Sequence, residues 1–232
     1  MTTPAACEAG GSQAAPVAPG VDPNAVPTAE TLSAAWDLTV LDREGKQVPF
    51  KDIVNASPRV LVMFIRHWFC PACQTYMQKL VGTVTPELLS SLPVKTSIVV
   101  IGNGGYQLID HWKREANCPF PVYADSNLKL YEAFQLPRSM GSKGSDYYNG
   151  NVLQGFLKAM SQVIWMPHKV HKAGDPSQNG GELLFEPAAA GKNGMKEVTW
   201  CHRMQHAADH AKFEDVFKRL GIENISRVAG PA

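Results

Sequence analysis

The sequence predicts an α/β sandwich in which helices cover a central, mostly parallel sheet, with antiparallel strands added on the C-terminal side. Three short runs of apolar and β-branched residues, 59–65, 96–102 and 120–125, have the pattern of strands buried on both faces. Amphipathic segments separate these runs, and strands that alternate with helices favour a parallel sheet. Two later runs, 182–187 and 197–204, are expected to supply the antiparallel part.

Composition and charge limit the kind of protein this is. The chain has 232 residues, of which 44% are hydrophobic and 19% are charged, as expected for a globular, water-soluble domain with a tail. The formal net charge of +1 gives no electrostatic reason to expect nucleic acid or an anionic membrane as a partner. No apolar run reaches the roughly 20 residues that a membrane-spanning helix needs.

The first 30 residues are rich in alanine, proline and glycine, and we expect a disordered tail because such a segment buries little surface. The tail lacks the basic start and apolar centre of a secretory signal, and it lacks the arginine of a mitochondrial presequence. A cytoplasmic location with reduced thiols is therefore expected. The domain is expected over residues 31–225, with a short tail at 226–232.

The first half of the chain carries clear signals for individual elements. Residues 28–36 have the pattern of a short helix, and residues 37–53 predict a strand, a turn at Glu44-Gly45 and a second extended piece. The buried run 59–65 is the first central strand. A helix is expected over residues 71–84 directly after it.

The middle of the chain repeats the alternation. The buried strand at 96–102 ends at Asn103-Gly104-Gly105, and an amphipathic helix follows at 106–118. The strand at 120–125 is followed by a helix that begins with Ser126 as its N-cap.

The last third is less regular. Residues 138–179 carry a weak pattern, with a helical stretch at 152–160. Residues 188–196 are expected to turn the chain between the two late strands, and the strand at 197–204 is expected at a sheet edge. An amphipathic helix at 208–222 is expected to stop at Gly221.

The cysteines give the main chemical signal. An odd and sparse set argues against a structural disulfide framework, and the set is Cys7, Cys70, Cys73, Cys118 and Cys201. Cys70 directly follows a buried strand, and Pro71 suits the first position of a helix. The Cys70 sulfur would then lie at a helix N-terminus, where free N–H groups and the helix dipole stabilise a thiolate.

Cys73 follows Cys70 by one helical turn, close enough for a disulfide after modest adjustment. This arrangement predicts a two-cysteine cycle, in which Cys70 attacks as a thiolate and Cys73 resolves the oxidised product. The spacing also leaves a zinc site and inert packing open. Two further functions stay open: an enzyme that transforms a small metabolite, with the cysteines as acid, base, nucleophile or metal anchor, and a non-catalytic binding module regulated by its thiols.

The four residues that directly precede Cys70 are candidates for the same site. Arg66 and His67 end a buried strand, where charge is costly unless it reaches solvent, a partner or a site. They are expected to lower the pKa of Cys70, or Arg66 pairs with an acid such as Asp125 and fixes the strand end. Trp68 and Phe69 are expected to cover the motif as an apolar collar, which serves packing or substrate contact.

A second group of polar residues follows the last predicted strand. Trp200, His202 or Arg203 is a candidate to reach the Cys70 pocket, with Arg203 supporting a thiolate or an anionic substrate. His202, His206 and His210 are spaced by four, so a helix would place them on one face as metal ligands. A strand before His202 would break that pattern and leave surface and packing histidines. We expect no metal site.

Five stretches together resemble a known family. They are FIRHWFCPACQTYM, SIVVIGNG, FPVYADSNLKLYEAF, NGGELLFE and TWCHRMQHAADHA. They resemble the peroxiredoxin-like AhpC/TSA group, the selenoprotein U-like branch of the thioredoxin-fold superfamily, over roughly residues 30–225. The resemblance implies a thioredoxin-like fold, with Cys70 and Cys73 in the redox position after the first buried strand.

The resemblance also implies roles for other positions. His67 stands where peroxiredoxins carry a threonine or serine, three residues before the reactive cysteine. Gly180 and Gly181 precede the strand expected to face the cysteines, where thioredoxins carry a cis-proline, and they would leave backbone accessible to a substrate.

The expected function is a thiol-dependent oxidoreductase that reduces a peroxide or exchanges thiols and disulfides. It would need no bound cofactor, and glutathione or a thioredoxin would recycle it. The expected partners are a small-molecule or peroxide substrate and a thiol-donor protein, with a homodimer as a further option.

Overall fold

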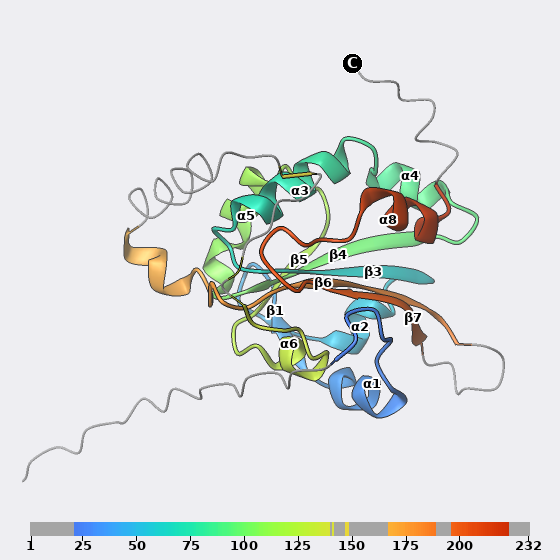
Figure 1. Cartoon of the computed structure of the whole chain (residues 1–232), viewed down its shortest axis with the longest axis horizontal. Helices are drawn as coiled ribbons and strands as arrows, with labels where there is room; N and C mark the ends of the chain where they lie inside the picture. Colours follow the sequence, from blue (N-terminus) through green and yellow to red (C-terminus); the bar gives the residue numbers. More distant parts are fainter. Residues whose placement is uncertain (1–20, 140, 142–146, 149–166, 189–195, 223–232) are drawn as a thin grey trace, which may run out of the picture.

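The computed structural model describes residues 21–139, 141, 147–148, 167–188 and 196–222. Within this part of the chain, strands form one sheet in the order β2-β1-β5-β4-β3-β6-β7 (Figure 1). The strands are β1 (Thr39–Leu41), β2 (Gln47–Pro49), β3 (Arg59–Ile65), β4 (Thr96–Asn103), β5 (Val122–Asp125), β6 (Gly181–Pro187) and β7 (Lys196–Arg203).

The central strands are parallel and both edges are antiparallel. β4 pairs in parallel with β3 and with β5. β6 pairs antiparallel with β3 and with β7, which confirms antiparallel strands on the C-terminal side. The opposite edge, formed by β1 and β2, is also antiparallel, and the sequence pattern did not indicate its place in the sheet.

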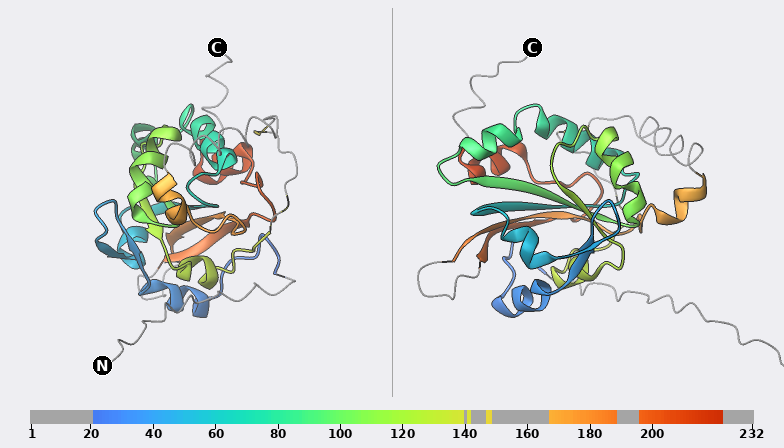
Figure 2. Two further views of the ribbon diagram at one scale, coloured as in Figure 1. Left: turned by 90° about the vertical axis from the view of Figure 1, so that its left-hand side faces the viewer. Right: turned by 180° about the vertical axis from the view of Figure 1, so that it is seen from behind.

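Helices cover both faces of the sheet. They are α1 (Ala29–Trp36), α2 (Phe50–Val54), α3 (Pro71–Val81), α4 (Pro86–Ser91), α5 (Ile109–Glu115), α6 (Lys129–Ala133) and α8 (Phe213–Leu220), with short 3₁₀ turns η1 (Tyr106–Leu108) and η2 (Pro167–Lys172). Figures 1 and 2 show α3, α4, α5 and α8 on one face, and α1, α2 and α6 on the other. The α/β/α sandwich is therefore confirmed.

Each central strand packs side chains into two hydrophobic cores, one on each face of the sheet, which explains its continuous apolar run. In β3, Leu61, Met63 and Ile65 pack toward α3, α4, α5 and α8. Val60, Val62 and Phe64 pack toward α1, α2 and α6. The side chains of a strand alternate between the two faces of a sheet, so a strand covered on both faces needs a continuous apolar run. No helix among the described residues is long and apolar enough to cross a membrane.

Several expected boundaries differ from the structure. α2 and α4 were not predicted, and the helix after Cys70 ends at Val81 rather than at Val84. The described fold starts before residue 31, since α1 begins at Ala29 and the N–H of Arg203 donates to the carbonyl of Pro23. The expected helix at 152–160 and the tail at 226–232 lie outside the described residues.

The predicted N-cap of α6 is wrong. Ser126 donates instead to the carbonyl of Gly104, 2.8 Å away. The carboxylate of Asp125 accepts from the N–H of Leu130 at 2.8 Å and satisfies the start of α6. The longer reach of a carboxylate that ends β5 replaces the hydroxyl expected one residue later.

Candidate active site

Cys70 ends the connection between β3 and α3. It is the N-cap of α3, and Pro71 occupies the first turn, which confirms the predicted position at a helix N-terminus. The N–H of Cys70 donates to the carbonyl of His67 at 3.1 Å, and the N–H of Trp68 donates to the carbonyl of Ala173 at 3.0 Å. These contacts hold the connection in one conformation.

The two sulfur atoms lie in contact. The Cys73 thiol donates to Cys70 Sγ at 3.0 Å, and the backbone N–H of Cys73 points to the same sulfur at 3.5 Å. The N–H of Arg66 points to Cys73 Sγ at 3.5 Å. Both cysteines are reduced and are only 1% exposed.

The contact separates the acidities of the two thiols. The hydrogen bond from Cys73 lowers the pKa of Cys70 well below its usual value, and positive charge on His67 and Arg66 acts in the same direction against burial. Burial, with the hydrogen bond to Cys70, raises the pKa of Cys73 well above its usual value. Cys70 therefore loses its proton more readily than Cys73 does.

Arg66 lies beside the cysteines and is held by neutral partners. Its Nε donates to Asn179 Oδ1 at 3.1 Å, and its Nη2 donates to the carbonyl of Pro176 at 2.5 Å. The alternative ion pair with Asp125 is wrong, since that carboxylate accepts from the backbone N–H groups of Lys129 and Leu130 at the start of α6. Arginine remains cationic across the physiological range, so Arg66 is a lasting source of positive charge near Cys70.

His67 is half-buried beside Arg66. Burial lowers the pKa of His67, the negative charge of Cys70 partly opposes this shift, and the charge of Arg66 adds to it. A histidine shifted in this direction is mostly neutral at pH 7. The two residues expected to support the thiolate therefore differ, because only Arg66 keeps its charge at neutral pH.

Trp68 and Phe69 pack in the core that contains the cysteines. Trp68 is fully buried, lies edge-on to Trp112 at 6.3 Å between ring centroids, and covers Gly102. A Cβ at Gly102 would lie 2.1 Å from the Trp68 ring. Phe69 is edge-on to His111 at 5.9 Å. These rings form the expected apolar collar by packing.

Gly180 and Gly181 lie against the end of β3 and the end of β7. A Cβ at Gly180 would lie 1.9 Å from the carbonyl oxygen of Phe64, and one at Gly181 would lie 2.4 Å from that of His202. Both glycines are buried, and the carbonyl of Gly180 accepts from the N–H of Met204 at 3.1 Å. Glycine is needed here for close approach of backbones.

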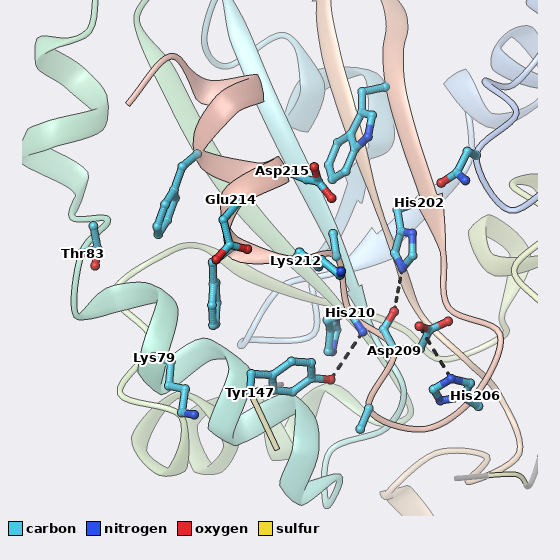
Figure 3. Close-up of a pocket in the computed structure, with 16 residues that line it drawn as sticks. Lys79, Thr83, Tyr147, His202, His206, Asp209, His210, Lys212, Glu214 and Asp215 are labelled. Atoms are coloured by element: carbon cyan, nitrogen blue, oxygen red, sulfur yellow. Dashed lines mark hydrogen bonds and ion pairs between the residues drawn. The ribbon is translucent and has the colours of Figure 1, made fainter. Parts of the chain in front are cut away.

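The residues at the end of β7 divide between the two faces of the sheet. Trp200 packs against the core that contains the cysteines. His202 lines a separate pocket and its Nε2 donates to the carbonyl of Asp209 at 2.7 Å (Figure 3). Arg203 points to the opposite face, where it donates to the carbonyls of Phe134 and Ala25 at 2.8 and 2.6 Å. The structure thus keeps Arg203 away from Cys70.

The histidine series does not form one helical face. His202 is in β7, and His206 and His210 follow in the connection before α8. Within the described ranges, no group of three or more histidine, cysteine or acidic side chains is placed to hold a metal ion. The other two described cysteines are buried thiols, and burial raises the pKa of Cys118 and of Cys201 to about 11.

A buried polar cluster near the cysteines was missed by sequence reasoning. Glu182 in β6 is fully buried, and its Oε1 lies 2.5 Å from Nδ1 of His210. The His210 ring stacks on Tyr76 of α3, with ring centroids 4.5 Å apart. An acid inside an otherwise apolar strand run was the available signal, because such a group needs a partner.

Comparison with known protein families shows the family of this chain. The family described as AhpC/TSA antioxidant enzyme matches residues 83–206, more than half of the chain. The chain belongs to this family. The matched residues begin after Cys70 and Cys73, so the match does not include the cysteine pair. Membership in the AhpC/TSA family supports thiol oxidoreductase chemistry in general.

The chain shares low sequence identity with the relatives described here. This AhpC/TSA family member is 27% identical to human Peroxiredoxin-like 2C over 236 residues, and the match covers 100% of this chain and 98% of the relative. It is 23% identical to the chloroplastic Thioredoxin-like protein AAED1 of Arabidopsis thaliana over 194 residues, covering 82% and 72%. A solved structure of Xanthomonas campestris Peroxiredoxin Q has a TM-score of 0.50 and 12% identity, covering 87% of this chain and 95% of that chain. That likeness shows a shared fold.

Proposed function

We propose that this chain is a thiol-dependent peroxide reductase that uses Cys70 as the nucleophile and Cys73 as the resolving thiol. The observation that carries the proposal is the 3.0 Å contact between the two sulfurs, together with the opposite shifts in their pKa values. The thiolate can attack a peroxide first, and the neighbouring thiol can then attack the oxidised cysteine without any change in their positions.

The proposed cycle has two steps. Cys70 Sγ attacks one oxygen of a peroxide, an S–O bond forms, the O–O bond breaks, and the leaving oxygen takes a proton to give water or an alcohol. Cys73 Sγ then attacks the Cys70 sulfenic acid, which forms the Cys70–Cys73 disulfide and releases water. Two molecules of glutathione, a thiol small enough to approach a buried sulfur, reduce the disulfide, restore the pair and leave as glutathione disulfide.

Burial favours a peroxide over a protein disulfide as the oxidant. Both cysteines are 1% exposed, so a partner protein has no direct contact with Cys70 Sγ. A small peroxide needs only a narrow approach to the sulfur. The reducing cytoplasm is the compartment that suits such a cycle.

The test is oxidation of the reduced full-length protein by one equivalent of hydrogen peroxide. We expect a Cys70–Cys73 disulfide in peptide mass mapping, and a dimedone adduct on Cys70 in the Cys73→Ser variant. Cys118→Ser is the matched control and should react as the wild type does. Peroxide consumption that survives Cys70→Ser would remove the proposed nucleophile, and faster reaction with oxidised glutathione than with peroxide would favour disulfide exchange.

A further inference from the structure

The chain carries the sequence Asn-Gly-Gly twice, at 103–105 and at 179–181. Asn103 is the last residue of β4, and Asn179 stands just before β6. Both asparagines are buried, at 2% and 0% exposed, so their amide groups need hydrogen-bond partners inside the protein. β3 lies between β4 and β6 in the sheet, and both asparagines meet Arg66, the residue that directly follows β3.

One asparagine holds the main chain of Arg66 and the other holds its side chain. Asn103 Nδ2 donates to the carbonyl of Arg66 at 3.1 Å. The Nε of Arg66 donates to Asn179 Oδ1, also at 3.1 Å. Asn179 is itself oriented, because its Nδ2 donates to Ser139 Oγ at 2.9 Å and that hydroxyl donates to the carbonyl of Gln205 at 3.0 Å. The oxygen of Asn179 therefore faces Arg66 in one fixed direction.

The arginine held in this way adjoins the cysteines. Its backbone N–H points to Cys73 Sγ at 3.5 Å. The hydrogen bond from Cys73 is the main cause of the lowered pKa of Cys70, and the charge of Arg66 acts in the same direction. A long side chain loses conformational entropy when it is fixed, so the guanidinium stays at this place only if buried acceptors hold it.

The acceptors that hold Arg66 carry no charge. They are the amide oxygen of Asn179 and the carbonyl oxygen of Pro176. Within the described ranges, no carboxylate forms an ion pair with Arg66. Asp175 is close in the chain, but its carboxylate lies 3.4 Å from Nη1 of Arg138. The positive charge of Arg66 is therefore not cancelled by its own partners.

An amide at position 179 differs from a carboxylate in this respect. A carboxylate would bind the guanidinium more strongly, because hydrogen bonds between charged groups are stronger than neutral ones. It would also place a negative charge next to the cation, and the two charges would nearly cancel at the distance of Cys70. An amide of the same shape holds the cation and leaves its charge intact.

We propose that Asn179 is a positioning residue that holds the Arg66 guanidinium beside Cys70 and leaves its charge uncompensated. The role rests on the proposed function, in which Cys70 attacks as a thiolate. Asn179 acts through Arg66, so its effect on Cys70 has to disappear when the guanidinium is absent.

The test is the pH profile of Cys70 alkylation by iodoacetamide in the reduced full-length protein, read by peptide mass spectrometry. Asn179→Leu has a similar volume and no acceptor, and it should move the midpoint to higher pH by about one unit. The same change made in Arg66→Met should leave the midpoint where Arg66→Met puts it, because the two residues act as one unit. An unmoved midpoint in Asn179→Leu would overturn the proposal, and so would equal shifts in both backgrounds.

Asn179→Asp separates the holding of Arg66 from its charge. The introduced carboxylate keeps an acceptor for Nε, so the unfolding free energy should stay closer to the wild type than that of Asn179→Leu. The midpoint should nevertheless move to higher pH, because the positive charge near Cys70 is cancelled. This variant keeps the test open if Asn179→Leu does not fold. A midpoint at the wild-type pH would show that the neutral amide has no special role.

Gln178→Leu is the matched control, because it removes a neighbouring buried amide that does not bind Arg66. Gln178 accepts from Nε of Arg138 at 3.1 Å and donates to the carbonyl of Leu136 at 3.0 Å. Its loss should lower stability and leave the midpoint unchanged. A shift as large as that of Asn179→Leu would mean a general effect of stability and would refute the positioning role.

The outcome is independent of the test of the proposed function. Alkylation reports the thiolate of Cys70 and needs no peroxide. A wild-type protein that fails to consume peroxide, yet shows the expected midpoints, would remove the proposed function and keep the role of Asn179. Peroxide reduction through Cys70 together with a wild-type midpoint in both Asn179 variants would remove the positioning role alone.

Discussion

The sulfur of Cys73 lies 3.0 Å from the sulfur of Cys70, with the Cys73 thiol as the donor. The contact joins the N-cap of α3 to the residue one turn later on the same helix. The hydrogen bond lowers the pKa of Cys70, and together with burial it raises the pKa of Cys73, so two cysteines of equal burial differ in acidity.

Removing the donor should make Cys70 less reactive. Cys73→Ala is expected to raise the pKa of Cys70 and to slow its alkylation at pH 7 on the order of tenfold, because the thiolate fraction falls. Cys73→Ser keeps a hydroxyl donor, so its rate of Cys70 alkylation should lie between those of Cys73→Ala and the wild type. The measurement is the rate of iodoacetamide modification of Cys70 against pH, by peptide mass spectrometry. An unchanged pH profile in Cys73→Ala would contradict the assigned role of Cys73.

The charge of Arg66 should matter to Cys70 in a way that the charge of Arg59 does not. Arg66→Met removes a cation beside the thiolate, so the Cys70 alkylation profile should move to higher pH. It also leaves Asn179 Oδ1 and the Pro176 carbonyl without their donor, which should cost about 1–3 kcal/mol of unfolding free energy.

Arg59→Met is the matched control at the other end of β3. It breaks contacts with Glu186 at 2.7 Å and with the carbonyl of Leu220 at 3.3 Å, so stability should fall. The alkylation profile should stay at its wild-type position. Equal shifts of the profile in both variants would show a general effect of stability instead of local charge.

His67 should act only in acid. Burial lowers the pKa of His67, so the ring gains its charge below the usual histidine range. His67→Gln is therefore expected to leave the alkylation rate of Cys70 unchanged at pH 7.5 and to slow it below about pH 6. A loss at pH 7.5 as large as that of Arg66→Met would mean that His67 is charged at neutral pH.

The contact of Trp68 with Gly102 should make that glycine irreplaceable. A Cβ at Gly102 would lie 2.1 Å from the Trp68 ring, which is fully buried. Gly102→Ala should lower the unfolding free energy by about 1–3 kcal/mol in urea denaturation. Gly141→Ala, where nothing lies within 4 Å of the added carbon, should change stability by less than about 0.5 kcal/mol.

Asp125 should make stability depend on pH. Burial raises its pKa from 3.8 to about 6, so the folded state binds this proton more tightly than the unfolded state does. The stability that this proton supplies is complete below about pH 3 and is lost as the pH rises through 6. Relative to Asp125→Asn, the wild type should lose about 2 kcal/mol between pH 4 and pH 7, measured by urea denaturation. A constant difference between the two proteins across this range would contradict the shifted pKa.

The central fold could be predicted because its signals are local. β3 coincides with the predicted run 59–65, since a strand covered on both faces must be apolar throughout. The stop at Gly221 is confirmed, as this residue adopts a left-handed conformation with φ of 75°. The short helix α2 was missed because its five residues, 50–54, are too few to show a helical period.

The candidate site could be predicted in part. The sequence by itself determined that Cys70 begins a helix, because a buried strand, a cysteine and Pro71 are adjacent in the chain. Only the tertiary structure decided which side chains meet there. Glu182 and His210 come together across 28 positions, and Arg203 turns to the face opposite the cysteines because strand side chains alternate. Such contacts depend on strand order and register, which a local pattern does not encode.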